Sequence, residues 1–96
     1  MNTEISCEHL QELLARGAQL IDVRSTMEFA QGALNGAINL PIDSFQHNMD
    51  AIDQSKPVLL YCRSGARSGM VKNFLDSLGY QNVYNIGSYS RYAFCQ

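Results

Sequence analysis

Hydrophobic residues along the chain alternate between short continuous runs and stretches with helical spacing. Four apolar or β-branched runs are typical of strands: residues 19–23, 36–41, 58–61 and 82–86. Four stretches between them have the spacing or the caps of helices: residues 6–17, 27–32, 43–54 and 66–78. This alternation of strand and helix predicts βα units around a parallel sheet, and therefore an α/β fold.

Several residues mark where these predicted elements begin and end. Ser6 is a suitable N-cap for the first helix, Gly17 is placed to end it, and Pro41 stops the second strand. The run at 58–61 is continuously apolar, as expected for a central parallel strand that is covered on both faces. It delivers Cys62 to the carboxyl edge of the sheet, where open α/β sheets bind their ligands.

Length, composition and charge narrow the class of protein. The chain has 96 residues, of which 46% are hydrophobic, so we expect residues 1–96 to form a single domain with one core. The net charge is −2 with only seven Lys and Arg, which gives no basic surface for nucleic acid. No apolar run approaches the ~20 residues that a membrane span requires. We therefore expect a soluble protein that binds a small molecule, with neither nucleic acid nor membrane as a partner.

The cysteines and the N-terminus suggest a cellular location. The N-terminal residues have neither a basic segment nor an apolar one, so no secretory signal is visible. Three cysteines at wide spacings fit neither a disulfide framework nor a metal site. We expect free thiols in a reducing cytoplasm, with Cys7 buried or idle. Cys95 is either a mobile tail thiol or part of a frayed end, in a tyrosine-rich tail at 84–94 that we expect to pack against the sheet.

The loop after the central strand places a cysteine where a thiol becomes reactive. A thiol acts as a nucleophile only as thiolate, and its pKa falls at helix N-termini and beside cationic side chains. Cys62 precedes a predicted helix, and Arg63 and Arg67 supply positive charge. A cysteine after an apolar strand is usually a small buried hydrophobe. A purely structural cysteine has no use for two nearby arginines, so we interpret Cys62 as reactive.

The residues between the two arginines are small. Gly65, with Ser64 and Ala66 on either side, lets the backbone curl so that successive N–H groups converge on one point. Such a ring of donors is suited to hold the negative charge of the sulfur or an oxyanion attached to it.

Four motifs together resemble a known family. They are "LIDVR" at 20–24, "EFAQGALNGAINLP" at 28–41, "CRSGARS" at 62–68 and "LGYQNVYNIGS" at 78–88. The chain resembles a single-domain rhodanese, of the thiosulfate sulfurtransferase family, from about residue 5 to residue 92. The motifs occur in the order that they have in this family, so their combination is specific even though each alone is weak.

The resemblance implies a fold, an activity and a site. The fold would be a three-layer α/β/α rhodanese-like domain with a central five-stranded parallel sheet. Cys62 would be catalytic and carry a persulfide, taking a sulfane sulfur from thiosulfate or a similar donor and passing it to cyanide or a thiol, which includes the thiol of a small protein. No metal or organic cofactor is implied, because the cysteine itself carries the transferred atom. The substrate-binding residues would be Arg63, Ser64, Gly65, Ala66, Arg67 and Ser68.

Two other functions remain open at this stage. One is a persulfide carrier or partner-binding module without enzymatic activity. The other is a cysteine phosphatase or an arsenate reductase, which would use a similar loop. In those enzymes five residues separate the cysteine from the arginine, whereas four separate Cys62 from Arg67. The shorter loop favours sulfur transfer over phosphoryl transfer.

Three charged residues near the end of the first strand are expected to have a structural role. Arg24 and Glu28 are four residues apart near a predicted helix start, so they could pair across one turn. Asp22 lies at the strand end, where charged groups commonly tie loops together. We therefore leave all three out of the predicted catalytic set.

Overall fold

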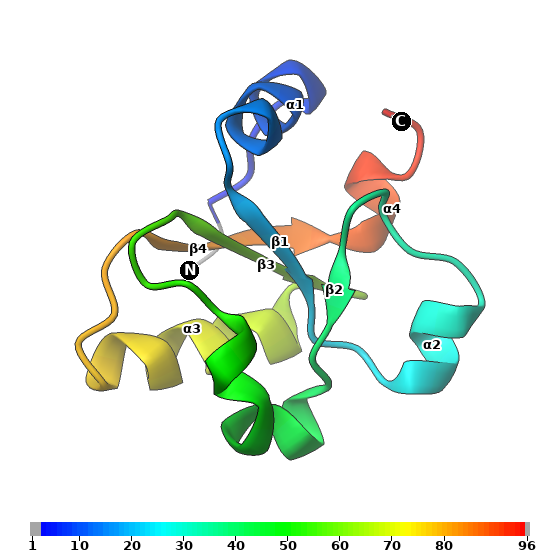
Figure 1. Ribbon diagram of the computed structural model, residues 1–96. Helices are drawn as coiled ribbons and strands as arrows, with labels where there is room; N and C mark the ends of the chain where they lie inside the picture. Colours follow the sequence, from blue (N-terminus) through cyan, green and yellow to red (C-terminus); the bar gives the residue numbers. More distant parts are fainter. Residues whose placement is uncertain (1–2, 96) are drawn as a thin grey trace.

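The structure, a computed structural model that describes residues 3–95, is a parallel sheet covered by helices on both faces (Figure 1). The elements in chain order are α1 (Cys7–Ala15), β1 (Gln19–Asp22), α2 (Thr26–Ala30), β2 (Ile38–Asn39), the 3₁₀ helix η1 (Ile42–Ala51), β3 (Val58–Cys62), α3 (Ala66–Ser77), β4 (Val83–Ser88) and α4 (Tyr89–Tyr92). The strand order is β2-β1-β3-β4, and every pairing is parallel. This confirms the predicted α/β class.

The sheet has four strands within the described residues, whereas five were predicted. β3 lies between β1 and β4, and all five of its residues are buried, as its apolar run predicts. The backbone N–H of Thr3 donates to the carbonyl of Asn85 in β4. The N-terminal segment thus contacts β4 at the position of a further strand, but this contact alone does not make it one.

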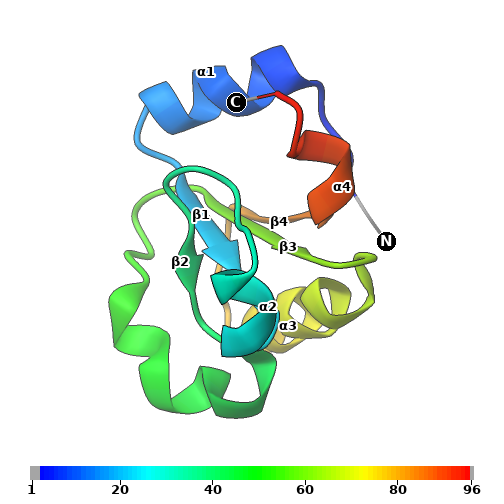
Figure 2. The same ribbon diagram turned by 90° about the vertical axis from the view of Figure 1, so that its right-hand side faces the viewer.

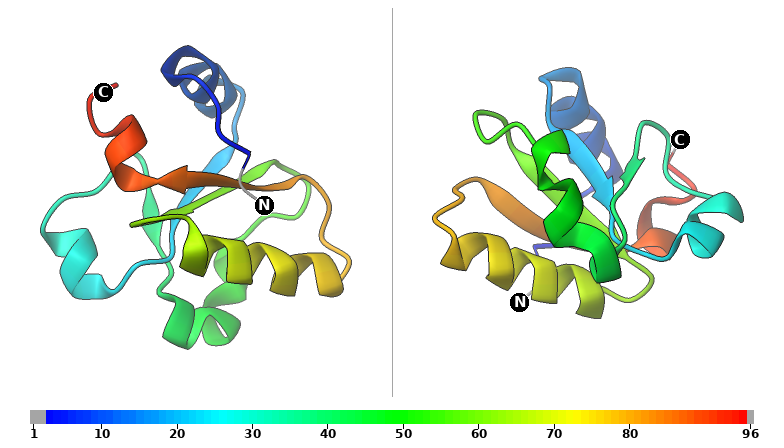
Figure 3. Two further views of the ribbon diagram at one scale, coloured as in Figure 1. Left: turned by 180° about the vertical axis from the view of Figure 1, so that it is seen from behind. Right: turned by 60° about the horizontal axis from the view of Figure 1, so that its bottom comes forward.

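The helices form a layer on each face of the sheet (Figures 2 and 3). α3 and η1 cover one face, where β-strand residues such as Leu60 and Val58 pack with Val71 and Leu75 of α3 and Phe45 of η1. α1 and α4 cover the other face, around a second buried cluster. The second cluster contains Leu10, Leu20, Leu34, Leu59, Tyr61, Ile86 and Tyr92. The sheet and the helices on its two faces thus form a three-layer α/β/α arrangement, with one buried cluster on each side of the sheet.

The ends of two helices follow the signals in the sequence. The Ser6 hydroxyl accepts a hydrogen bond from the N–H of His9 at 3.0 Å, which caps α1. Gly17 follows α1 with φ of 96°, a conformation that favours glycine. At α2, the Ser25 side chain caps the N–H of Glu28 and the Glu28 carboxylate caps the N–H of Ser25. This capping box fixes the position of the Glu28 side chain.

The predicted helix at 43–54 is a 3₁₀ helix over a somewhat different range, Ile42–Ala51. Pro41 precedes it and no side chain caps its start. Within it the Asn48 side chain donates to the carbonyl of Ser44 at 3.0 Å, and such side-chain bonds compete with the backbone bonds of an α-helix. The tighter geometry is consistent with this competition.

The expectation of three free thiols is wrong, because Cys7 and Cys95 form a disulfide bond with a Cα–Cα distance of 5.5 Å. It joins α1 to the end of the chain, and Cys62 is free. Disulfide bonds persist mainly in oxidising compartments. The prediction of a cytoplasmic location was based partly on three free thiols, so that part of its basis is gone and the location stays a prediction. Among residues 3–95, no helix is long and apolar enough to cross a membrane.

The aromatic tail packs against the sheet, as predicted. Tyr92 is fully buried, and its hydroxyl donates to the carbonyl of Ile86 at 2.7 Å and accepts from the N–H of Ile5 at 3.1 Å. The prediction does not extend to Phe94, which is 96% exposed. Tyr92 and the disulfide bond therefore hold the C-terminal segment from two sides.

Replacing Cys7 and Cys95 together by Ser is expected to lower the free energy of unfolding by about 2–5 kcal/mol, because the disulfide bond closes a long loop in the unfolded chain. The loop spans 88 residues. Urea unfolding followed by circular dichroism measures this loss. Dithiothreitol should lower the urea midpoint of the Cys62→Ser variant by as much as the double replacement lowers that of the wild type. It should leave the urea midpoint of the double variant unchanged. A midpoint of Cys62→Ser that does not respond to dithiothreitol would contradict the stabilising role.

Candidate active site

The site is the loop between β3 and α3, at the carboxyl edge of the sheet. Cys62 is the last residue of β3 and is paired in register with Ser88, the last residue of β4. The chain then turns through Gly65, which has φ of 98° and precedes the first residue of α3, Ala66. A residue with a Cβ is strained at this φ, so glycine suits the position. The turn brings the start of the helix back over the cysteine.

Donors from the loop and the helix face the sulfur. The N–H of Gly65 donates to Cys62 Sγ at 3.0 Å, and the Ser68 hydroxyl lies 3.4 Å from the same atom. Burial raises the pKa of the Cys62 thiol, but hydrogen bonds from the Ser68 side chain and from backbone N–H groups of the loop outweigh it. The pKa therefore lies below its ordinary value, as expected for a reactive cysteine.

Asn85 of β4 supports this loop from behind. Its side-chain amide donates to the carbonyl of Gly65 at 2.9 Å, and its Oδ1 accepts from the Ser68 hydroxyl at 2.7 Å and from the N–H of Gly87 at 3.1 Å. Asn85 and Ser68 are both fully buried. Sequence reasoning did not select Asn85. The available signal was a polar residue within a buried strand, which requires hydrogen-bond partners.

Arg67 is not a free positive charge at the site, because it forms a bidentate ion pair with Glu28 of α2. Its Nη1 lies 2.7 Å from Glu28 Oε1, and its Nη2 lies 3.0 Å from Oε2. Hydrogen bonds from Arg67 and from the Ser25 N–H lower the pKa of Glu28 to about 2. The expected pair of Arg24 with Glu28 is therefore wrong, because the capping box turns the Glu28 carboxylate towards α3 while Arg24 points inward.

Arg24 binds Asp22 instead. Both nitrogens of one edge of the guanidinium contact the Asp22 carboxylate, at distances of 2.7–3.0 Å, and both residues are buried. Arg24 Nη2 also donates to the carbonyl of Gly32 at 2.7 Å, and its Cζ lies 4.5 Å from the centre of the Tyr89 ring. Buried charges need such pairing. The geometry agrees with the expected structural role of Asp22 and Arg24.

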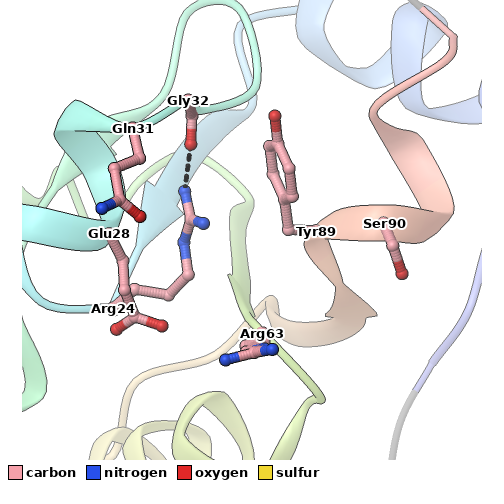
Figure 4. A pocket seen from close by; sticks show the side chains of 7 residues that line it. All are labelled: Arg24, Glu28, Gln31, Gly32, Arg63, Tyr89 and Ser90. Carbon is pink, nitrogen blue, oxygen red and sulfur yellow. Dashed lines mark hydrogen bonds between the residues drawn. The ribbon is translucent and has the colours of Figure 1, made fainter.

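A pocket of about 570 Å³ opens beside the loop (Figure 4). Its lining residues come from the segment after β1, from α2, from the loop after β3 and from α4: Arg24, Glu28, Gln31, Gly32, Arg63, Tyr89 and Ser90. Figure 4 shows the Arg24 guanidinium between Gly32 and the Tyr89 ring, and Arg63 on the side of β3. Cys62 itself is buried, and its chain neighbour Arg63 lines the pocket.

The structure places the sequence-predicted residues in three groups. Gly65 and Ser68 contact the sulfur directly. Ser64 shapes the turn, since its hydroxyl accepts from the N–H of Ala66 at 3.3 Å. The two arginines differ: Arg67 is paired with Glu28, whereas Arg63 is exposed and has no hydrogen bond or ion pair within residues 3–95.

Comparisons with known proteins agree with this geometry. The family model described as "Rhodanese-like domain" matches residues 6–94. A sulfurtransferase of Allochromatium vinosum is 38% identical over 88 residues, which cover 90% of this chain and 82% of that protein. The thiosulfate sulfurtransferase GlpE of Haemophilus influenzae is 34% identical over 83 residues, which cover 86% and 79%.

A solved structure shows the same fold at similar length. The human single-domain sulfurtransferase TSTD1 superposes on this chain with a TM-score of 0.74 at 29% sequence identity. The superposition covers 94% of each of the two chains. The chain spans 56% of the length of two other curated relatives that it matches, and 79–82% of the two named above. The family match extends over nearly all described residues and includes the cysteine loop. The chain therefore belongs to the rhodanese-like domain family.

Proposed function

We propose that the protein moves a sulfane sulfur from thiosulfate, or a similar donor, to a thiophilic acceptor such as cyanide or a thiol, through a persulfide on Cys62. The observation that carries this proposal is the free, buried Cys62 sulfur, which accepts from the Gly65 N–H at 3.0 Å and has the Ser68 hydroxyl within reach at 3.4 Å. Relatives named sulfurtransferase and thiosulfate sulfurtransferase support the same reaction class.

The reaction has two displacement steps. In the first, the Cys62 thiolate attacks the outer sulfur of thiosulfate, an S–S bond forms to Cys62, and sulfite leaves with the electron pair of the broken bond. In the second, cyanide or a thiolate attacks the outer sulfur of the persulfide, and the Cys62 thiolate is regenerated. No proton has to be removed from the nucleophile, because it reacts as an anion.

The loop stabilises negative charge in both states. The thiolate and the persulfide are both anions, and the persulfide places its charge one atom further from Cys62. The N–H of Gly65, at the start of α3, donates to the Cys62 sulfur, and such preorganised donors favour negative charge that develops during a reaction. Cys62 is buried, and the next two residues of the loop, Arg63 and Ser64, are exposed.

Thiosulfate is expected to add one sulfur atom, about 32 Da, to the protein, because the activated Cys62 thiolate displaces sulfite. Intact mass spectrometry measures the adduct, and cyanide should remove it as thiocyanate. The double variant with Cys7 and Cys95 replaced by Ser should gain the same mass, whereas Cys62→Ser should not. An adduct on Cys62→Ser would refute the assigned nucleophile, and a persulfide that gives no thiocyanate would identify a carrier.

Replacing Ser68 by Ala is expected to raise the pKa of Cys62, because it removes a donor that favours the thiolate. Alkylation by iodoacetamide at pH 7 should slow by about ten- to a hundredfold, the effect of one hydrogen bond to a charged group. The pH profile of the alkylation rate should move to higher pH. Ser77→Ala, near the other end of α3, is the control and should keep the wild-type profile; equal profiles of Ser68→Ala and wild type would contradict this role.

No hydrolysis of p-nitrophenyl phosphate is expected under conditions that support sulfur transfer. Four residues separate Cys62 from Arg67, and the Gly65 N–H already lies 3.0 Å from the sulfur, so the ring suits a sulfur atom rather than a phosphoryl group with its oxygens in line. Release of p-nitrophenol measures the activity. Robust hydrolysis by the unmodified protein that disappears in Cys62→Ser would overturn the proposed sulfurtransferase function.

A further inference from the structure

The start of α3, which carries the donors nearest the Cys62 sulfur, has a flexible backbone sequence. The Gly65 nitrogen and the Ser68 hydroxyl lie 3.0 and 3.4 Å from the sulfur. Gly65 is the N-cap residue of α3 and has no side chain to cap the helix, and the N–H of Gly69 closes the first turn on its carbonyl at 3.0 Å. Glycine has the greatest backbone freedom of all residues, so a turn between two glycines needs support from other elements.

Asn85 of the neighbouring strand β4 supplies this support at both donor residues. Its Nδ2 donates to the carbonyl of Gly65 at 2.9 Å, and its Oδ1 accepts from the Ser68 hydroxyl at 2.7 Å. Asn85 is fully buried, and α3 packs along β4 (Figure 3). One side chain therefore ties β4 to the two residues that supply hydrogen bonds to the sulfur.

A β-bulge in β4 fixes the orientation of the Asn85 amide. Leu60 of β3 pairs with Asn85. The next residue, Tyr61, pairs with Gly87, so the pairing skips one residue of β4. The N–H of Gly87 donates to Asn85 Oδ1 at 3.1 Å. Because an N–H only donates and the Gly65 carbonyl only accepts, one orientation of the amide satisfies both. Bulges beside active sites commonly re-aim a side chain in this way.

The helix side of the contact leaves room for the amide. A Cβ added at Gly69 would lie 3.3 Å from Asn85 Nδ2, which is closer than ordinary van der Waals contact. Alanine is the better residue inside a helix. Glycine at position 69 therefore lowers the stability of the helix but allows Asn85 to reach the Gly65 carbonyl.

We propose that Asn85 is a positioning residue, which holds the first turn of α3 at the distance from Cys62 at which the Gly65 N–H binds the sulfur. The inference rests on the proposed function, whose nucleophile is the Cys62 thiolate, and names the residue that prepares its site. Donors that are held in place before the reaction stabilise negative charge without having to reorganise during it. Asn85 supplies this order without adding a charge of its own.

The test removes the amide from a chain that lacks the Ser68 hydroxyl. Asn85→Leu keeps a similar size but forms no side-chain hydrogen bonds. In the Ser68→Ala background it should slow alkylation of Cys62 by iodoacetamide at pH 7 about tenfold further, the lower end of the effect of one hydrogen bond to a charged group. The pH profile should move to higher pH, because a thiolate that loses the Gly65 N–H has a higher pKa. In the wild-type background the slowing should be smaller, since the released Ser68 hydroxyl can turn to the sulfur.

The Gly65 amide resonance reports on its own hydrogen bond. In wild type the ¹H–¹⁵N signal of Gly65 should shift as Cys62 ionises, because this N–H donates to the sulfur. In the chain with both Ser68→Ala and Asn85→Leu it should shift less with pH and exchange faster with solvent. The inference is wrong if Asn85→Leu lowers the free energy of unfolding but changes neither this shift nor the alkylation profile of the Ser68→Ala background.

Asn39 provides a matched control. Its Nδ2 donates to the carbonyls of Asp22 and Arg24, both at 3.0 Å, so it too ties two segments together through backbone carbonyls. Asn39→Leu should lower the free energy of unfolding while the alkylation of Cys62 keeps its wild-type pH profile. A shift of that profile equal to the shift caused by Asn85→Leu would show a general loss of order and contradict the specific role of Asn85.

None of these variants changes the charge of the protein. Several charged groups surround the loop: Arg63, the ion pair of Arg67 with Glu28 and the ion pair of Arg24 with Asp22. They are the same in every variant, so a shift of the alkylation profile reports on hydrogen bonds to the sulfur.

Should Asn85→Leu fail to fold, Gly69→Ala changes the same contact from the helix, because its methyl group would press on Asn85 Nδ2. In the Ser68→Ala background it should slow the alkylation of Cys62, although alanine favours the helix. An unchanged or faster rate there would overturn the positioning role. If thiosulfate forms no persulfide in any variant, the proposed function fails, while the alkylation and resonance data still decide on Asn85.

Discussion

The proposed site depends first on stabilising negative charge at a buried sulfur, that of Cys62. Burying a charge is costly unless hydrogen bonds replace the lost water. The fold meets this need at one point, with the Gly65 N–H at 3.0 Å and the Ser68 hydroxyl at 3.4 Å from the sulfur. These donors converge only because β3 ends at Cys62 and Gly65, with its positive φ, starts α3 directly above it. A fully buried central strand and a tight turn are thus both requirements of the chemistry.

Ion pairs decide how much of the arginine charge acts on a substrate. From the sequence, Arg63 and Arg67 appear equivalent on either side of a small turn. In the structure Arg67 shares its charge with Glu28, 39 positions earlier in the chain, and Arg63 does not share its charge with any described carboxylate. The arginines close to a cysteine in the sequence are therefore not enough to estimate the electrostatic potential at its sulfur. A carboxylate from another helix or strand can neutralise one of them.

Local signals in the sequence predicted the elements and the reactive loop, while contacts between distant residues escaped them. The strand at 58–61, the helix after Cys62 and the glycine turn depend on neighbouring residues, and each appears close to its expected place. The Cys7–Cys95 bond and the support of the loop by Asn85 depend on how separate elements pack. The sequence also did not predict that η1 is a 3₁₀ helix. α and 3₁₀ helices differ in their backbone hydrogen bonds, which the spacing of apolar residues does not reveal.

Asn85 also explains how one hydroxyl can serve the sulfur in two charge states. Ser68 Oγ has a single hydrogen but two acceptors within reach, Asn85 Oδ1 at 2.7 Å and Cys62 Sγ at 3.4 Å. With a neutral thiol the hydrogen favours the nearer Asn85 oxygen. When the sulfur is negative, the hydrogen can turn to it, because charge strengthens a hydrogen bond. Asn85 Oδ1 then keeps the N–H of Gly87 at 3.1 Å, so no buried acceptor is left without a partner. The exchange lowers the cost of forming a buried thiolate without any change in the backbone.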